Sequence, residues 1–302
     1  MLKTISCILV LSSPAIAGSL SPVVGGSAAP PGKWSDVVLV VAPDAACSGT
    51  LIAPDVVLTA GHCIEVHPDE VVIGTVDYAK PGGEVIKVKS ATAYPDWQHS
   101  YDVGVLVLDH ASMTKPGTIA AACTANKQLV DGASLELVGF GLTTKSGTGD
   151  NSKLEQAKLP VIDAECTQDP ACEPSVAPGG EFTAGGQGTD SCFGDSGGPL
   201  YFADAHGATQ IGVVSRGVGT QGEPCGGGGV YVRADQVVPW IEKTTGRTIG
   251  RSTCDGKADG EGDGSEMSSG GCDATGGALG GGALALAAVA WILTIPRRRE
   301  RS

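Results

Sequence analysis

Residues Thr189 to Leu200 read TDSCFGDSGGPL, and this stretch decides how the chain is interpreted. It places Asp190 six residues before Ser196, and Asp195 immediately before it. A serine hydroxyl is a poor nucleophile at neutral pH unless a base takes its proton and a third group orients that base. The stretch therefore predicts a reactive serine whose partners lie elsewhere in the sequence.

Candidates for these partners lie upstream. His62 stands in LTAGHC, directly after a predicted strand, and Asp102 begins the strand signal in SYDVGVLVLD. A side chain at the end of a strand is held in a fixed position, as a base and its orienting acid must be. Asp109, at the far end of the same strand, is interpreted as a turn residue. The remaining histidines are interpreted as ordinary surface or core residues: His67, His99, His110 and His206.

The composition of the 302-residue chain narrows its class. A hydrophobic share of 41% is enough for a core. The net charge of −13 excludes nucleic acid as a partner and mildly favours cationic substrates. Ten cysteines without a CxxC pair indicate an oxidising compartment rather than a zinc or redox motif.

The N-terminus predicts export. A basic start is followed by the apolar run ISCILVL and by the A-x-A site that ends at Ala17. This arrangement is typical of a secretory signal peptide, here residues 1–17. Cys7 is removed with that peptide.

Between Val23 and about Thr245 the chain alternates short β-branched runs, such as DVVLVV and GVLVL, with Gly, Pro and Asp. This pattern predicts an all-β domain of barrel or sandwich type. Only Val232–Gly246 has helical spacing, and it predicts a terminal helix that stops at Gly246.

The composition changes after Gly246. Residues 247–275 are rich in Gly, Asp and Ser and predict a disordered linker. Residues 276–302 contain the apolar run Ala278–Pro296 and an arginine-rich end. They predict a single hydrophobic tail helix that crosses a membrane with its arginines on the cytoplasmic side. The alternative is a Gly/Ala-rich helix buried in the fold.

The motifs TAGHC, YDVGVLVL and GDSGGP, in this order, resemble the trypsin-like (chymotrypsin-fold) serine endopeptidases, and the resemblance covers Val23 to about Gly246. It implies two six-stranded antiparallel β-barrels with a C-terminal helix and the active site between the barrels. It also implies that Ser196 is the nucleophile, His62 the general base and Asp102 its orienting acid. The backbone N–H groups of Gly194 and Ser196 then form the oxyanion hole.

The resemblance separates the two aspartates. Asp195 pairs with the α-ammonium of Val23, which begins the segment VVGG, once proteolysis has exposed it. Asp190 lies at the floor of the specificity pocket, where a carboxylate selects Arg or Lys before the cleaved bond. The pocket walls correspond to Ser215, Gly217 and Gly229.

The chain also departs from the family. Arg216 stands where the family usually has an aromatic residue, and it brings a cation near the pocket. Pro22 precedes Val23, so residues 18–22 are a short propeptide that a different, activating protease must remove. The alternative function is a non-catalytic surface binding module that keeps the protease fold in a zymogen-like state.

The resemblance also pairs most of the cysteines. Cys47–Cys63 and Cys192–Cys225 match two family disulfides, and Cys166–Cys172 closes a local loop. A third family pair is absent, with Leu135 and Phe202 at its two positions. Cys123 and Cys254 remain, and their pairing is left open.

The C-terminus carries a second resemblance. SSGGCDATGG, the apolar run and RRRER are similar to the C-terminal sorting tags of myxobacterial surface proteins. This implies processing near Cys272 by an enzyme in the membrane and display or release at the cell surface. The alternative is a permanent stop-transfer anchor. Taken together, the sequence predicts an exported serine endopeptidase that cleaves protein or peptide substrates after Arg or Lys without a metal or organic cofactor.

Overall fold

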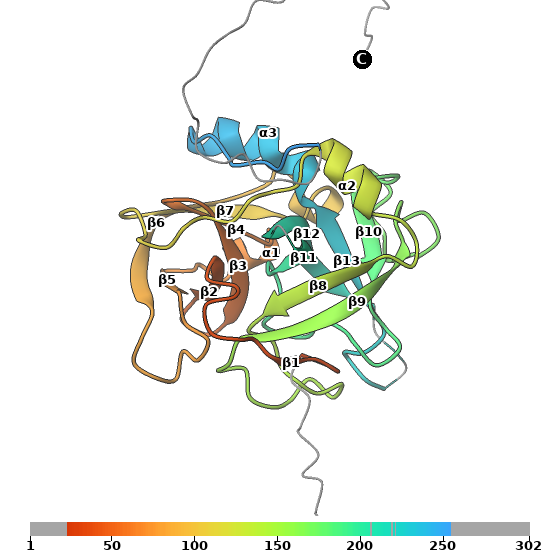
Figure 1. Ribbon diagram of the computed structural model, residues 1–302, viewed down its shortest axis with the longest axis horizontal. Helices are drawn as coiled ribbons and strands as arrows, with labels where there is room; N and C mark the ends of the chain where they lie inside the picture. The colour runs from red at the N-terminus through yellow and green to blue at the C-terminus, as the bar shows by residue number, and fades with distance from the viewer. Residues whose placement is uncertain (1–22, 206, 219, 221, 255–302) are drawn as a thin grey trace, which may run out of the picture. The chain divides into compact units, whose positions relative to one another are not determined.

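The computed structural model describes residues 23–205, 207–218, 220 and 222–254, and it shows a mostly β protein (Figure 1). The predicted signal peptide, propeptide and hydrophobic tail, with Cys272, lie outside the described residues, as does the linker beyond Cys254. Within the described part of the chain, no helix is both long and apolar enough to span a bilayer.

Six antiparallel strands form a first closed barrel. Neighbouring strands follow the order β2-β3-β4-β7-β6-β5, and β5 pairs with β2 to close the ring. The strands are β2 (Val37–Val41), β3 (Ala46–Ala53), β4 (Val56–Thr59), β5 (Glu70–Ile73), β6 (Glu84–Ala93) and β7 (Gly104–Leu108).

Strands β8 to β13 form a second barrel, which β8 closes by pairing with β9, and the short strand β1 adds to the outer side of β9. The strands are β1 (Ser27–Ala28), β8 (Ser134–Gly139), β9 (Glu155–Asp163), β10 (Glu181–Ala184), β11 (Pro199–Asp204), β12 (Gly207–Gly217) and β13 (Gly229–Arg233). The expectation of two six-stranded antiparallel barrels is confirmed.

Strand β2 shows how the sequence builds both a barrel core and the contact between barrels. Its sequence VVLVV is buried on both faces. Because side chains alternate along a strand, Val38 and Val40 pack into the core of the first barrel. Val37 and Leu39 point the other way and pack with Tyr201 of the second barrel. A continuous apolar run is therefore required here, rather than an apolar/polar alternation.

The short helices are α1 (His62–Glu65), the 3₁₀ helix η1 (Trp97–His99) and α2 (Ala122–Gln128). The predicted terminal helix is present as α3 (Ala234–Thr245), and Gly246 ends it. Figure 1 shows α3 along one side of the two barrels. Its residues Val237, Val238 and Ile241 pack in one cluster with Val103 and Val105 of the first barrel.

Four disulfides fasten the fold: Cys47–Cys63, Cys192–Cys225, Cys166–Cys172 and Cys123–Cys254. The last pair ties α2 to the segment after α3, so the packed region extends past Gly246 to Cys254. At the two positions of the missing family disulfide, Leu135 and Phe202 pack in the same core cluster. An apolar contact thus stands in place of a covalent one.

Candidate active site

His62 and Asp102 are held together by two hydrogen bonds. His62 begins α1 directly after β4, and Asp102 lies just before β7, the strand paired with β4. The backbone N–H of His62 donates to Asp102 Oδ1 at 3.0 Å, and His62 Nδ1 lies 2.9 Å from Asp102 Oδ2. An ionised carboxylate only accepts, so Nδ1 carries the proton and Nε2 is free to act as a base.

Asp102 is kept ionised although it is only 6% exposed. Burial raises its pKa, but hydrogen bonds from His62 and Ser215 outweigh burial and hold the pKa below its ordinary value. The Ser215 hydroxyl donates to Asp102 Oδ2 at 2.7 Å. Ser215, predicted from the resemblance as a pocket wall, is therefore also a direct partner of the acid.

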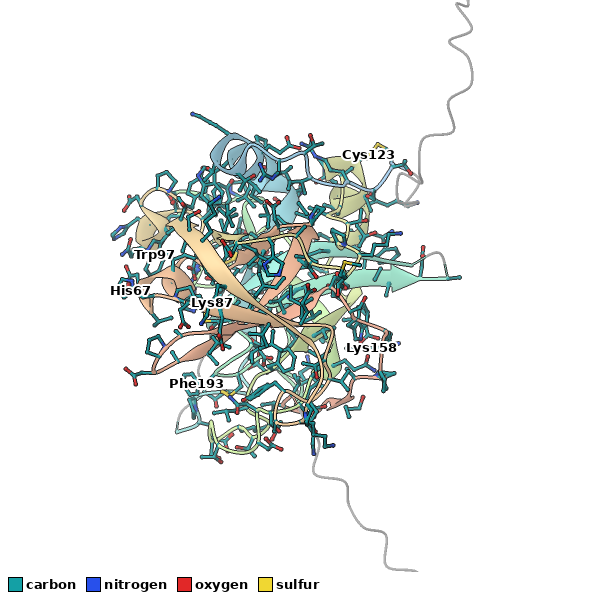
Figure 2. All side chains as sticks on the ribbon, turned by 90° about the vertical axis from the view of Figure 1, so that its left-hand side faces the viewer. His67, Lys87, Trp97, Cys123, Lys158 and Phe193 are labelled. Atoms are coloured by element: carbon teal, nitrogen blue, oxygen red, sulfur yellow. A yellow bond between two sulfur atoms is a disulfide. The ribbon has the colours of Figure 1, made fainter. Side chains whose placement is uncertain are left out.

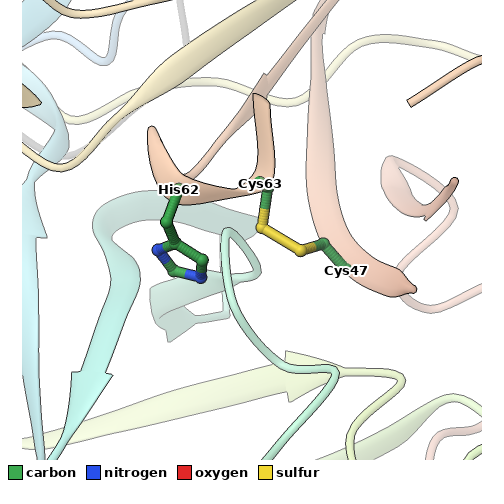
Figure 3. A group of neighbouring side chains, drawn as sticks. All are labelled: Cys47, His62 and Cys63. Carbon is green, nitrogen blue, oxygen red and sulfur yellow. A yellow bond between two sulfur atoms is a disulfide. The ribbon is translucent and has the colours of Figure 1, made fainter. Parts of the chain in front are cut away.

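The Cys47–Cys63 disulfide braces the histidine from the neighbouring position (Figure 3). Cys63 is fully buried, whereas a third of the His62 side chain is exposed. These three side chains cluster closely enough to suggest a metal site. However, the two sulfurs are bonded to each other, so neither is a thiolate ligand, and the cluster is a structural brace.

His62, Asp102 and Ser196 line one cleft of about 480 Å³. Ser215, Arg216 and other residues of the two barrels complete its walls: Trp97, Ser191, Cys192, Phe193, Val214, Gly217, Pro224 and Cys225. The structure therefore brings together three residues that are far apart in the sequence, in a cavity large enough for a side chain.

The backbone before Ser196 requires a glycine at position 194. Gly194 has φ +100°, and a Cβ at this position would lie 2.7 Å from the Phe140 carbonyl oxygen. Only glycine adopts this conformation without strain. The Ser48 hydroxyl donates to the Gly194 carbonyl at 2.8 Å, which fixes the peptide next to the nucleophile. This geometry supports the predicted role of Gly194.

Asp190 lies beneath the cleft rather than in its wall. It is fully buried and accepts backbone N–H groups from Ser191, Gly226 and Gly228 at 2.7, 2.7 and 3.1 Å. Burial raises its pKa in spite of these hydrogen bonds. Gly217 lines the cleft as expected, whereas Asp190 and Gly229 do not.

Asp195 is also fully buried, and it does not line the cleft. Its carboxylate accepts the N–H groups of Gly141 and Cys192, both at 2.9 Å. Burial, together with the negative charges of Asp190 and Glu155, raises the pKa of Asp195 to about 7. Val23 is fully buried as well, and the adjacent Val24 carbonyl accepts the N–H of Asp190 at 3.0 Å.

Arg216 lines the cleft, but its charge is paired. Its Nη1 and Nη2 donate to the two carboxylate oxygens of Glu181, each at 2.8 Å, and Glu181 is fully buried. Nη1 also lies 2.9 Å from the Ser215 hydroxyl oxygen. Sequence reasoning missed Glu181 because nothing in its local sequence marks a partner 35 residues away.

Sequence reasoning also missed two aromatic residues of the cleft. Trp97 and Phe193 both line it and lie on the same side of the molecule (Figure 2). The Trp97 ring centroid is 6.2 Å from that of His62, and Phe193 is 60% exposed. Phe193 lies three residues before Ser196, which was a signal available in the sequence, whereas nothing local marked Trp97.

Comparison with known proteins agrees with this geometry. The family described as Trypsin matches residues 23–241. The chain is 28% identical over 254 residues to coagulation factor XII of Sus scrofa. That match covers 75% of this chain and 40% of the relative, so the chain spans about two fifths of the relative's length. With a match across most of its length and a His–Asp–Ser cleft between two β-barrels, the chain belongs to the trypsin family of serine proteases.

Proposed function

We propose that the protein is an exported serine endopeptidase that hydrolyses peptide bonds after Arg and Lys. The observation that carries this proposal is the His62–Asp102 pair, with Nδ1 bonded to the carboxylate, in the same cleft as Ser196. The family implies protein or peptide substrates. The four disulfides support an extracellular location.

We expect the reaction to follow the mechanism of serine proteases. Ser196 Oγ attacks the carbonyl carbon while His62 Nε2 takes the hydroxyl proton, and Asp102 stabilises the resulting imidazolium. The negative carbonyl oxygen receives N–H groups from Gly194 and Ser196. His62 then gives its proton to the leaving amine, which breaks the peptide bond and leaves an acyl group on Ser196. Water repeats the sequence and releases the acid.

The preference for Arg and Lys rests on Asp190. Its carboxylate is fully buried, and its neighbours Ser191 and Cys192 line the cleft. A cationic side chain that enters the cleft supplies a counter-charge to this desolvated acid, whereas an apolar side chain leaves the acid unpaired. The net charge of −13 also favours the approach of cationic substrates.

Activation requires a free amine on Val23. Protein that begins at Val23 carries a cation that can pair with Asp195, whereas protein that begins at Gly18 does not. We expect a serine-directed fluorophosphonate to label Ser196 rapidly in the first form and slowly in the second, with Ser196→Ala as the control. Equal labelling of both forms would show that the oxyanion hole needs no amine. Absence of labelling in both would favour the non-catalytic binding module.

For the tail, we propose that processing near Cys272 releases or displays the catalytic domain at the cell surface. The apolar run from Ala278 and the arginines after Pro296 support this proposal. Intact-mass measurement of surface and released protein should show a form that lacks the residues after about Cys272, and Cys272→Ala should retain the full-length chain in the membrane. A mature form that contains Arg297 would instead identify a permanent anchor.

A further inference from the structure

Glu155 is a buried carboxyl group that the proposed reaction does not use. It is only 3% exposed, and its Oε2 has no hydrogen-bond partner among the described residues. It begins β9, and it lies on the inward face of that strand with Ala157 and Leu159. An unpartnered buried carboxyl oxygen is costly, so this position calls for a partner.

Strand pairing places Glu155 beside Asp195. Glu155 lies directly opposite Gly139 of β8. Residues directly opposed in an antiparallel pair project on the same face of the sheet. A Cβ built on Gly139 would overlap Asp195 Oδ1, and one on Gly141 would overlap Asp195 Oδ2. The Asp195 carboxylate thus occupies the space that a side chain at Gly139 would fill, on the face to which Glu155 points.

The electrostatics agree with this placement. Burial, together with Asp150, raises the pKa of Glu155 to about 7, while Lys153 opposes the rise. The pKa of Asp195 is also raised to about 7, in part by the charge of Glu155. Lys153 is more than half exposed and lies 3.9 Å from Asp150, so solvent and this neighbour weaken its effect on the buried acid. Two other titratable groups interact with Asp195: the charge of Asp190 also raises its pKa, and burial, together with the charges of Asp190 and Asp195, raises the pKa of the Tyr231 hydroxyl.

Val23, whose α-ammonium is the proposed partner of Asp195, lies in the core beside strands β8 and β9. Val23 is fully buried in the same core cluster as Leu137 of β8 and Ala157 of β9. Leu137 lies two positions from Gly139, and Ala157 lies two positions from Glu155, so all four residues share one face of the sheet. We propose that Glu155 is a second carboxylate for this ammonium, so that the activated protein holds its new N-terminus between Asp195 and Glu155. This inference rests on the proposed activation at Val23.

Glu155 would then be a positioning residue, which acts on the oxyanion hole through the amine and Asp195. Two nearby carboxylates favour the charged form of an amine more than one does. The activated enzyme should therefore keep its active conformation to a higher pH than Asp195 alone would allow. Loss of Glu155 should lower the pH at which activity disappears.

The test uses protein that begins at Val23 and compares Glu155→Gln with Glu136→Gln. Both changes remove one negative charge, and Glu136 lies on β8 but on the other face of the strand, where it is partly exposed. We expect the pH at which kcat/KM declines on the alkaline side (the alkaline limb) to be lower by about one unit or more in Glu155→Gln. A shift of this size is typical when an amine loses a nearby opposite charge. The limb in Glu136→Gln should stay within about 0.2 units of the wild type. Equal limbs in both variants would overturn the proposal.

A second measurement separates this inference from the proposed function. Thermal unfolding between pH 7 and pH 10 reports the buried ion pair without any substrate. Protein beginning at Val23 should lose stability at a lower pH in Glu155→Gln than in wild type, whether or not either one is active. If wild type is inactive but this difference is present, the proposed function fails and the role of Glu155 stands. If wild type is active and the unfolding curves coincide, the role of Glu155 fails alone.

Discussion

Arg216→Met removes one partner of a buried ion pair next to the active site. The Arg216 guanidinium donates to both oxygens of Glu181 at 2.8 Å, and its Nε and Nη2 donate to the Ala171 carbonyl at 2.8 and 2.6 Å. Methionine fills a similar volume but donates no hydrogen bond. Glu181, which is fully buried, would then keep only the Glu173 N–H at 2.8 Å.

The size of the effect follows from this burial. Breaking a buried pair by removing one partner typically costs about 3–5 kcal/mol, because a charge is left uncompensated. The Arg216 side chain is 34% exposed, so water can replace part of the guanidinium, which favours the lower end, about 3 kcal/mol. In a domain of this size each kcal/mol lowers Tm by about 2–4 °C, which gives a loss of about 6–12 °C.

The assay is thermal unfolding of protein beginning at Val23, with a double-mutant cycle. Arg216→Met combined with Glu181→Leu should recover most of the lost stability, since no charge is then buried alone. Arg251→Met is the matched control, because its partner Glu242 forms a surface pair at 2.8 Å with both side chains partly exposed. We expect that control to lose about 1 kcal/mol or less. A loss below about 2 °C in Arg216→Met, or strict additivity in the cycle, would refute this reasoning.

Three further predictions follow from the same geometry. Asp190→Ser should lower kcat/KM for Arg and Lys substrates on the order of 10³-fold or more, and equal cleavage after Phe and Arg by the wild type would contradict the role given to Asp190. Ser196→Ala and His62→Ala should each abolish nearly all peptidase activity, with the double variant scarcely worse because the triad acts as a unit; turnover by Ser196→Ala would identify another nucleophile. In protein beginning at Gly18, the pKa values of Glu155 and Asp195 are raised to about 7, above those of the unfolded chain. The stability that these groups contribute is therefore present near pH 4 and lost as the pH rises through 7, so Tm should fall on the order of 5 °C or more between pH 5 and pH 8.5; a flat Tm would contradict the buried acid pair.

The all-β class could be predicted because its signals are local, whereas the two-barrel arrangement was implied by the family resemblance. Runs such as VVLVV and GVLVL read as short buried strands on their own, and the helical spacing before Gly246 stands out against them. His62, Asp102 and Ser196 could be assigned because each sits in a motif whose neighbours are also constrained, such as Gly194 before the nucleophile. Each of these signals depends on residues within about ten positions of one another in the chain.

The parts that could not be predicted depend on pairs of distant residues. Glu181 gives no local sign that it meets Arg216, and Glu155 gives none that it lies opposite Gly139, beside Asp195. In a chain with 33 Asp and Glu residues, neither acid differs in its local sequence from an ordinary solvent-exposed one. What marks the two acids is burial, which becomes visible only when β9 and β10 are placed in the second barrel. Both acids also act on groups of the site: Glu181 reaches Ser215 through Arg216, and, in addition to burial, the charge of Glu155 raises the pKa of Asp195. Arg216 and Glu155 thus have one proposed explanation in common, in which a buried acid beside the active site is paired with a cation from elsewhere in the chain. For Glu181 that cation is Arg216 of the folded protein, whereas for Glu155 we propose that it is the ammonium created by a cut before Val23.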